Sequence, residues 1–423
     1  MSQQKKKLVI GLFGFGVVGE GLYKVLQQTP TLDATIKSVC IKHPDKPRNA
    51  PRSLFTTDAE VLLNDPEINV IVELIDDADA AIRIARRALS SGKALVSASK
   101  KMIAQHLPEL LELQRRHETP FLYEAACCAS IPVIRNLEEY YDNDLLRSVQ
   151  GIVNGSTNYI LTRIAEDNLS FDAALQLAQE KGFAESDPSL DIEGKDAVFK
   201  LAILLGHAYG IVHEPEQITH AGITGIKEGD AVFAREKGFK IKLIAQASKL
   251  KNGKVAAFVL PRFVHHDSNL FLVSNEYNGI EIGSGLADKQ FFCGKGAGSF
   301  PTASAVLSDL SALRYDYRYE YKKLLANESD RLSNDFYLHV YVSFRKLHQV
   351  PHHLFARIDE WSSNQHGCSV SGLIHFSRLE HDWWKQDFVS LITYPDAVID
   401  REDFEASDSL EPLQAEWREA SVH

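Results

Sequence analysis

The segment at residues 182–200 places five carboxylates in front of an apolar helix and reads GFAESDPSLDIEGKDAVFK. Asp196 and Lys200 are four residues apart, so a helix puts them on the same face. The residues after Asp196 are mostly apolar, and we therefore expect most of this helix to be buried. A lysine in a buried helix, beside carboxylates, is a candidate acid or base. The five carboxylates belong to Glu185, Asp187, Asp191, Glu193 and Asp196.

Two other interpretations of this acidic segment stay open. A plain solvated surface fits its composition, whereas a calcium loop needs a D-x-D-x-D-G spacing that is absent. Pro188 stiffens the turn, which favours an ordered binding site over a solvated surface. A second lysine, Lys100, follows Ser99 at the end of another predicted strand, and the carboxyl ends of parallel strands face a ligand crevice. One lysine from each part of the chain could therefore meet at a substrate.

Residues 14–19 read GFGVVG, a G-x-G-x-x-G between a predicted strand and a predicted helix. In that context the pattern indicates a dinucleotide site of the Rossmann type. The first glycine allows the tight turn, the second lets the backbone approach a pyrophosphate, and the third lets helix and strand pack closely. The alternative is a glycine-rich turn without a ligand. The residues expected at the cofactor here are Gly14, Phe15, Gly16, Val17, Val18 and Gly19.

The end of the second predicted strand carries no acidic residue for a ribose 2′-hydroxyl. Lys42, Lys46 and Arg48 are instead available for a 2′-phosphate. The pattern favours NADP over NAD, with a solvated basic loop as the alternative.

Strands and helices alternate along the first 130 or so residues, which predicts parallel βαβ units and an α/β fold. A strand at Val149–Val153 opens a second, α+β region. The expected elements of the first region are strands at Leu8–Phe13, Ser38–Ile41, Val70–Ile75, Leu95–Ser97 and Phe121–Tyr123, with helices at about Val17–Gln27 and Ile82–Leu89. Those of the second are strands at Val255–Leu260, Leu270–Val273 and Ile280–Ile282 and a helix at about Thr302–Leu313.

The last 90 or so residues differ in composition, because they contain all four tryptophans. Phe336–Phe344 alternates like a half-buried strand. We expect a helix at His353–Trp361 and strands at Ser369–Phe376 and Phe388–Tyr394. Six histidines lie between residues 348 and 381 without tight ligand spacing, so no metal site is predicted there.

The net charge of -11 argues against nucleic acid or an anionic membrane as a partner. No stretch approaches the roughly 20 apolar residues of a membrane span. The five cysteines are odd in number and two are adjacent, which predicts no disulfide framework. We therefore expect a cytoplasmic protein that acts on a small molecule.

Five segments resemble the homoserine dehydrogenase family, in the family's own order, over about residues 7–325. They read LVSASKKMIA, YEAACCASIPVIRNL, GIVNGSTNYIL, AESDPSLDIEGKDAVFKLAIL and GAGSFPTASAVLSDL. The resemblance implies the interconversion of L-homoserine and L-aspartate 4-semialdehyde with NAD(P), within threonine, methionine and isoleucine synthesis.

The resemblance also implies roles for individual residues. Lys200 would donate and accept the proton at the substrate oxygen, and Lys100 would lie beside the nicotinamide and the substrate. Gly296, in a second glycine-rich stretch, would touch the cofactor. The residues implied at the substrate are Glu185, Asp191, Asp196, Gly155 and Ser156. A sodium ion would be held, mainly by backbone carbonyls, at Glu124, Cys127, Ala129 and Ile131.

The chain departs from the family at Ser99, where the family has asparagine, and at Ser156, which keeps a hydroxyl. Asp76-Asp77 replaces the usual Gly-Gly after the third strand and would repel a pyrophosphate if it faced one. Two alternatives to an active enzyme of this family stay open: a different Rossmann reductase with a related substrate domain, and a catalytically impaired regulatory paralogue.

The resulting prediction is a Rossmann-type domain at 1–148, completed by 294–325, and an α+β substrate-binding and dimerisation domain at 149–293. A small α+β domain at 330–423 faintly resembles a degenerate ACT-like regulatory domain, although the usual Asp-Arg-Pro-Gly turn is absent. A homodimer or homotetramer is expected.

Overall fold

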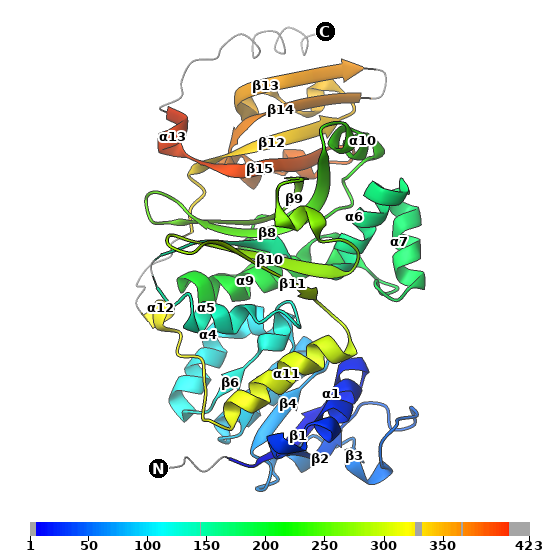
Figure 1. The fold of residues 1–423 in the computed structure, drawn as a ribbon, viewed down its shortest axis with the longest axis vertical. Helices are drawn as coiled ribbons and strands as arrows, with labels where there is room; N and C mark the ends of the chain where they lie inside the picture. The colour runs from blue at the N-terminus through cyan, green and yellow to red at the C-terminus, as the bar shows by residue number, and fades with distance from the viewer. Residues whose placement is uncertain (1–5, 144, 326–331, 365–366, 406–423) are drawn as a thin grey trace. The chain divides into compact units, whose positions relative to one another are not determined.

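The computed structural model describes residues 6–143, 145–325, 332–364 and 367–405 (Figure 1). The chain forms two compact units. Unit 1 consists of residues 1–144, 202–215 and 294–328, and unit 2 of residues 145–201, 216–293 and 329–423. In the described part of the chain, no helix has the length and apolar character needed to cross a membrane.

A six-stranded parallel sheet forms the centre of unit 1, in the order β3-β2-β1-β4-β5-β6. Strands β4 and β5 are buried along their whole length, as expected where helices cover both faces of a parallel sheet. The strand order reverses between β1 and β4, the point where such sheets bind ligands. The strands are β1 (Leu8–Phe13), β2 (Ala34–Cys40), β3 (Phe55–Thr56), β4 (Val70–Glu73), β5 (Ala94–Ser97) and β6 (Phe121–Leu122).

Helices α1 and α11 of unit 1 pack side by side (Figure 1). Their approach depends on Gly21, because a Cβ there would collide with Ser299. The helices of this unit are α1 (Val17–Gln28), α2 (Glu60–Leu63), α3 (Ala78–Ser90), α4 (Lys100–His117), α5 (Val133–Glu139), α11 (Ser299–Leu313) and α12 (Lys322–Leu325). Helix α9 (Lys195–Tyr209) contributes its first residues to unit 2 and the remainder to unit 1.

Unit 2 contains a nine-stranded mixed sheet in the order β11-β10-β7-β8-β9-β15-β12-β14-β13. Helix α6 packs on β8 and β10, and α7 packs on α6. The strands are β7 (Leu146–Ile152), β8 (Phe239–Lys249), β9 (Val255–His265), β10 (Tyr277–Ser284), β11 (Asp288–Lys295), β12 (Phe336–Phe344), β13 (Phe355–Asn364), β14 (Gly367–His375) and β15 (Ser390–Asp400). The helices are α6 (Gly155–Asp167), α7 (Phe171–Glu180), α8 (Ser189–Ile192), α10 (Glu228–Glu236) and α13 (Arg401–Glu405).

The predicted fold class, α/β with a Rossmann-type sheet and a second region with its own sheet, is confirmed. The C-terminal strands join the larger sheet where β15 pairs with β9 in parallel, at Thr393 and Arg262. The domain boundaries and the ACT-like character of the C-terminal region stay predictions.

Two predicted elements are wrong. The segment at His353–Trp361 is not a helix but lies mainly in strand β13, whose pairing with β14 shifts register twice, between Phe355 and Arg357 and between Ile358 and Glu360. These irregularities break the strict alternation of a strand, so its apolar residues fall at helix-like spacing.

The segment at Leu270–Val273 is not a strand. Residues Asn269–Leu272 form a single 3-10 turn, and the Ser268 side chain accepts a hydrogen bond from the amide of Leu270 at its start. Four apolar residues in a row are too few to distinguish a strand from a turn that buries only some of them. Here Leu270 is 2% exposed and Leu272 is 75% exposed.

Strands β7 and β10 approach closely at Gly151, where a Cβ would collide with the carbonyl oxygen of Gly279. We expect Gly151→Ala to lower the free energy of unfolding by about 1–3 kcal/mol, because the backbone must move. Gly229→Ala on α10 is the matched control: its Cβ meets nothing within 4 Å. Alanine there should stabilise the helix by about 0.5–1 kcal/mol. Urea unfolding of both variants measures this, and equal stabilities would contradict the predicted collision.

Candidate functional site

The glycine loop of unit 1 is shaped by close backbone approaches. Gly14 has φ of 92°, and a Cβ there would lie 2.6 Å from the carbonyl oxygen of Leu74. A Cβ at Gly19 would collide with the carbonyl oxygen of Gly14. By contrast, a Cβ at Gly16 would meet nothing within 4 Å. The first and third glycines therefore serve the fold, whereas the second leaves open space in front of the loop, where a pyrophosphate fits.

Helix α1 begins directly behind this open space. Its N-cap is Gly16, so among the described residues no side chain caps its first amides. Such amides suit a phosphate group. Val17 is 70% exposed at this end, and Val18 follows it. The hydroxyl of Ser299 donates to the carbonyl of Val17 at 2.7 Å, which brings the start of α11 to the glycine loop. Gly296 lies in the short segment between β11 and α11.

A buried carboxyl group joins two loops at the same edge of the sheet. Glu73, at the end of β4, is 0% exposed and accepts from the hydroxyl of Ser97 at 2.5 Å and from the amide of Ile75 at 2.7 Å. Ser97 in turn accepts from the amide of Ser99 at 3.1 Å. Glu73 therefore holds both the β4–α3 loop and the segment that leads to Lys100. Burial raises the pKa of Glu73 to about 7, although the two hydrogen bonds act in the opposite direction.

Lys100 is the first residue of α4 and is half-buried. It belongs to unit 1, whereas Lys200 belongs to unit 2. The expectation that the two lysines meet at a substrate stays a prediction. Of the two adjacent aspartates Asp76 and Asp77, Asp77 is the N-cap of α3 and accepts from the amide of Ala80 at 3.0 Å. Its carboxylate is therefore engaged by its own helix, while Asp76 is exposed.

One basic residue after β2, Arg48, is linked to the glycine loop through aromatic rings. The Arg48 guanidinium donates to the carbonyls of Lys46 and His43, both at 2.7 Å, and lies 5.4 Å from the ring centre of Phe55. The ring of Phe55 in turn packs edge-on against Phe15 at 5.0 Å. Lys42 and Lys46 are exposed on the same loop.

In unit 2, Lys200 and Asp196 form a buried ion pair on α9. The Nζ–Oδ2 distance is 2.7 Å, and the residues are 6% and 2% exposed. Lys200 also donates to the carbonyl oxygen of Val153, at the end of β7, at 2.6 Å. Buried charges are stable only when hydrogen bonds satisfy them, so this pair depends on the strand end beside it.

Asn154 was not among the predicted site residues, yet it connects this cluster. Its amide nitrogen donates to Asp196 at 2.8 Å and to Asp191 at 2.7 Å. Its oxygen accepts from the amide of Thr157 at 2.8 Å, which makes it the N-cap of α6. An asparagine directly after an apolar strand, where a helix can begin, is a typical N-cap signal and could have identified it.

The other predicted substrate residues lie at the start of α6 and in the acidic turn. Gly155 is the first residue of α6. Ser156 donates to the carbonyl of Phe183 at 2.6 Å, which ties α6 to the acidic turn. Glu185 is exposed in that turn. The structure therefore brings Asp191, Asp196 and Lys200 together and places Glu185 in the segment that follows Phe183.

The loop predicted to hold a cation has a strained backbone. Cys128 and Ala129 both have left-handed conformations, with φ of 57° and 40°. The carboxylate of Glu124 accepts from the amides of Ile134 and Arg135, both at 2.9 Å, and so caps α5. A cation here would therefore be held by main-chain oxygens, including that of Glu124, in the loop that runs to Ile131 and contains Cys127. Left-handed non-glycine residues concentrate at ligand sites.

The chain is similar to known proteins over both units. A family model described as "Homoserine dehydrogenase" matches residues 132–311, and one described as "Homoserine dehydrogenase, NAD binding domain" matches residues 14–124. A homoserine dehydrogenase of Synechocystis sp. is 37% identical over 71% of this chain and 72% of its own length. One of Bacillus subtilis is 32% identical over 82% and 85%. A crystal structure of a homoserine dehydrogenase from Thiobacillus denitrificans has a TM-score of 0.81 at 26% identity, covering 92% of this chain and 98% of that one.

We expect Glu73 to make the stability of unit 1 depend on pH. Its pKa rises from 4.5 to about 7 on folding, so its stabilising effect is complete below pH 4.5 and is lost as pH rises through about 7. Glu73→Gln keeps a donor and an acceptor but does not titrate. Relative to wild type, its free energy of unfolding should rise by up to about 3 kcal/mol between pH 4.5 and pH 8.

Urea unfolding at both pH values measures this difference. Glu67→Gln is the control, because Glu67 forms an exposed ion pair with Lys37. It should change the free energy of unfolding by less than about 1 kcal/mol at either pH. If Glu73→Gln differs from wild type by the same amount at both pH values, Glu73 does not titrate in this range.

Proposed function

Because this chain belongs to the homoserine dehydrogenase family, whose members interconvert L-homoserine and L-aspartate 4-semialdehyde with NAD(P), we propose that Lys200 moves the proton in that reaction. The observation that carries this proposal is the buried ion pair of Lys200 with Asp196, completed by Asn154 and the carbonyl of Val153. A lysine held in this way keeps its Nζ in one place, as general acid–base catalysis requires.

The bound nicotinamide supplies the hydride chemistry. When hydride leaves the carbon that bears the hydroxyl, the hydroxyl proton must leave too, and Nζ of Lys200 would accept it. In the reverse direction Lys200 would return a proton to the aldehyde oxygen. Asp196 would stabilise the protonated lysine, because an opposite charge within 4 Å favours the charged form. Lys100, the first residue of α4, stays a predicted contact of the nicotinamide and the substrate.

The remaining carboxylates suit the ammonium group of the amino-acid substrate. We assign this role to Asp191, which Asn154 orients, and to Glu185 in the adjacent turn. Gly155 and Ser156, at the start of α6, would also contact the substrate. Carboxylate oxygens are strong acceptors for an ammonium group, and a substrate with both an ammonium and a carboxylate needs donors as well.

Two properties of the cofactor site are distinct: that it binds a dinucleotide, and that it prefers NADP to NAD. The dinucleotide site itself follows from the family and from the space in front of Gly16. The preference for NADP over NAD is our proposal, and it is supported by Arg48, which is held near Phe15, and by the exposed Lys42.

Three further expectations belong to the same proposal. We propose that the loop at residues 124–131 binds a sodium ion through main-chain oxygens, supported by its left-handed residues. We also propose that the chain forms a homodimer or homotetramer, as the family resemblance implies. A cytoplasmic location stays a prediction.

We expect Lys200→Ala to reduce turnover of homoserine by about 10² to 10⁴, the usual contribution of a general acid or base. Binding of NADP+ should be unchanged, because the glycine loop lies in unit 1. Lys195→Ala is the matched control on the same helix, since Lys195 is exposed and pairs only with its neighbour Glu193 among the contacts described. The formation of NAD(P)H at saturating homoserine measures the effect.

Turnover of Lys200→Ala within a few-fold of wild type would remove Lys200 from the mechanism. A wild-type protein that binds NADP+ but shows no homoserine-dependent turnover would instead favour the regulatory paralogue.

We expect wild type to use NADP+ at least as well as NAD+. Arg48→Ala should weaken the use of NADP+ by about tenfold and leave NAD+ almost unaffected, because a charge-assisted hydrogen bond to the 2′-phosphate contributes about 1.5–3 kcal/mol. Lys24→Ala on α1, which pairs with Glu20, is the control. The ratio of kcat/KM for the two cofactors is the measurement. An unchanged ratio in Arg48→Ala would show that the guanidinium serves only its own loop.

A further inference from the structure

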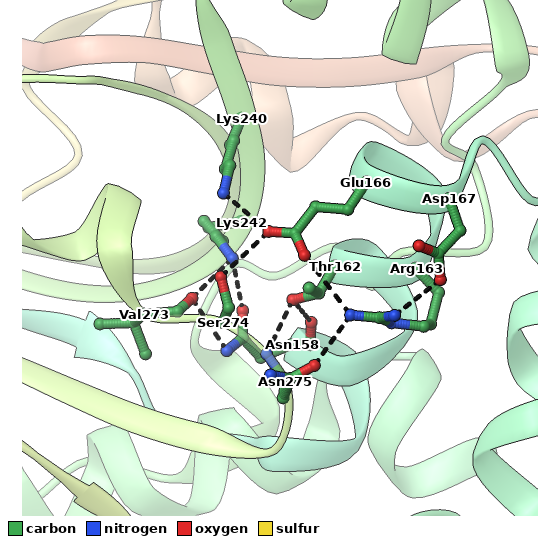
Figure 2. A network of polar contacts seen from close by, with 10 residues as sticks. All are labelled: Asn158, Thr162, Arg163, Glu166, Asp167, Lys240, Lys242, Val273, Ser274 and Asn275. Carbon is green, nitrogen blue, oxygen red and sulfur yellow. Dashed lines mark hydrogen bonds and ion pairs between the residues drawn. The ribbon is translucent and has the colours of Figure 1, made fainter.

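A buried lysine belongs to a network of polar contacts in unit 2 (Figure 2). Lys242, on β8, is 1% exposed. Its Nζ donates to Oδ1 of Asn158 at 2.8 Å and to the carbonyl oxygen of Val273 at 2.7 Å. Its partner Val273 belongs to a buried apolar cluster with Ile152, Ile244, Val264 and Leu270. Burying a lysine costs free energy unless hydrogen bonds satisfy its amine.

Asn158, the first partner of Lys242, joins helix α6 to the loop before β10. Its amide nitrogen donates to the carbonyls of Val273 at 3.2 Å and Tyr277 at 3.0 Å. Its own main-chain amide donates to the carbonyl of Asn154 at 3.2 Å, within the first turn of α6. Lys242 therefore contacts, directly or through one residue, both the start of α6 and the loop at 273–277.

This loop and the start of α6 are in direct contact. A Cβ at Gly155 would lie 2.6 Å from the carbonyl oxygen of Glu276, so the two backbones touch there. A change in the loop would therefore move Gly155 and its neighbour Asn154. Asn154 is the residue whose side chain holds Asp191 and Asp196.

We propose that Lys242 is a positioning residue for the reaction: through Asn158 and Val273 it fixes the first turn of α6, and thereby Asn154 and the ion pair of Lys200. This inference rests on the proposed function of Lys200. Lys242 acts on the site through its own hydrogen bonds, those of Asn158 and the backbone contact at Gly155.

The chemistry of an amine suits this role. A neutral amine has two N–H donors, and Lys242 uses two, one for Asn158 and one for Val273. Burial lowers the pKa of Lys242 to about 7, and nearby Lys240 lowers it further, while Glu166 acts in the opposite direction. The neutral form therefore makes both hydrogen bonds without placing a charge in the apolar core.

A second, more exposed set of contacts surrounds the same loop and provides a control. Lys240 forms an ion pair with Glu166 at 2.9 Å, and Glu166 also accepts from the hydroxyl of Ser274 at 3.3 Å (Figure 2). Lys240 lies two residues before Lys242 on the same strand, but the described structure shows no contact between it and Asn158. Replacing Lys240 therefore perturbs the same strand and loop but leaves the hydrogen bonds of Lys242 in place.

The experiment compares Lys242→Met with Lys240→Met in the full-length protein. Methionine keeps the apolar stem of lysine and removes both donors. We expect Lys242→Met to lower kcat for homoserine by about 10- to 100-fold, as displacement of a catalytic group by about 1 Å does. The Kd for NADP+, measured by titration, should stay within twofold of wild type. Lys240→Met should keep kcat within twofold.

A double-mutant cycle identifies the route. If Lys242 acts through Asn158, the losses in kcat of Lys242→Met and Asn158→Leu should not multiply in the combined variant. A merely structural role would lower the thermal midpoint but leave kcat per folded molecule unchanged at low temperature. Lys242→Gln, which keeps one donor, is the second variant if methionine prevents folding, and its kcat should lie between those of wild type and Asn158→Leu.

Normal kcat in Lys242→Met or in Lys242→Gln, with turnover still lost in Lys200→Ala, would overturn this inference alone. Losses that multiply in the cycle would overturn the route through Asn158. Full turnover in Lys200→Ala would instead contradict the proposed function on which the inference rests.

Discussion

The buried ion pair between Lys200 and Asp196 is the constraint on which the site depends. Two opposite charges taken out of water are stable only if polar groups replace the lost hydration. Here these groups come from the end of β7: the carbonyl of Val153 accepts from the lysine, and the amide of Asn154 donates to the aspartate. The end of a strand, the start of a helix and the middle of another helix must therefore keep one arrangement. A site built on three such elements is held more rigidly than one built on a loop.

Unit 1 also contains a buried ionisable side chain that is satisfied by polar groups near strand ends. Among the described residues, Glu73 accepts hydrogen bonds from a hydroxyl and a backbone amide and from no basic side chain. Ile75 lies in the loop after β4, against Gly14, and Ser97 is the last residue of β5. In each unit, then, a polar group that is costly to bury is placed where loops at the carboxyl ends of strands must be held in register. Burying such a group costs free energy, and the hydrogen bonds that satisfy it hold the loops of the site in one conformation.

The C-terminal strands illustrate how a sheet can extend without a strong sequence signal. They join the rest of unit 2 through the parallel pair of Thr393 and Arg262. The guanidinium of Arg262 is buried and donates to side-chain oxygens of Gln150 on β7 and Gln246 on β8. Burial lowers the pKa of Arg262 to about 10. The guanidinium also donates to the hydroxyl of Thr393 at 3.4 Å, so this polar cluster connects the C-terminal region to the strand that ends at the site.

Local spacing in the sequence was enough to predict several features of the fold and of the site. The glycines of residues 14–19 indicated the dinucleotide loop, and the four-residue interval of Asp196 and Lys200 placed both on one helical face, because helix and turn geometry depend on neighbouring residues. The strand β13 could not be predicted in this way, since its register shifts arise from pairing with β14. Asn154 lies 42 residues from Asp196, and Lys242 lies 84 residues from Asn158. Only the tertiary structure joins such pairs, because a hydrogen bond between distant residues depends on how whole elements pack, and single-sequence spacing carries no record of that packing.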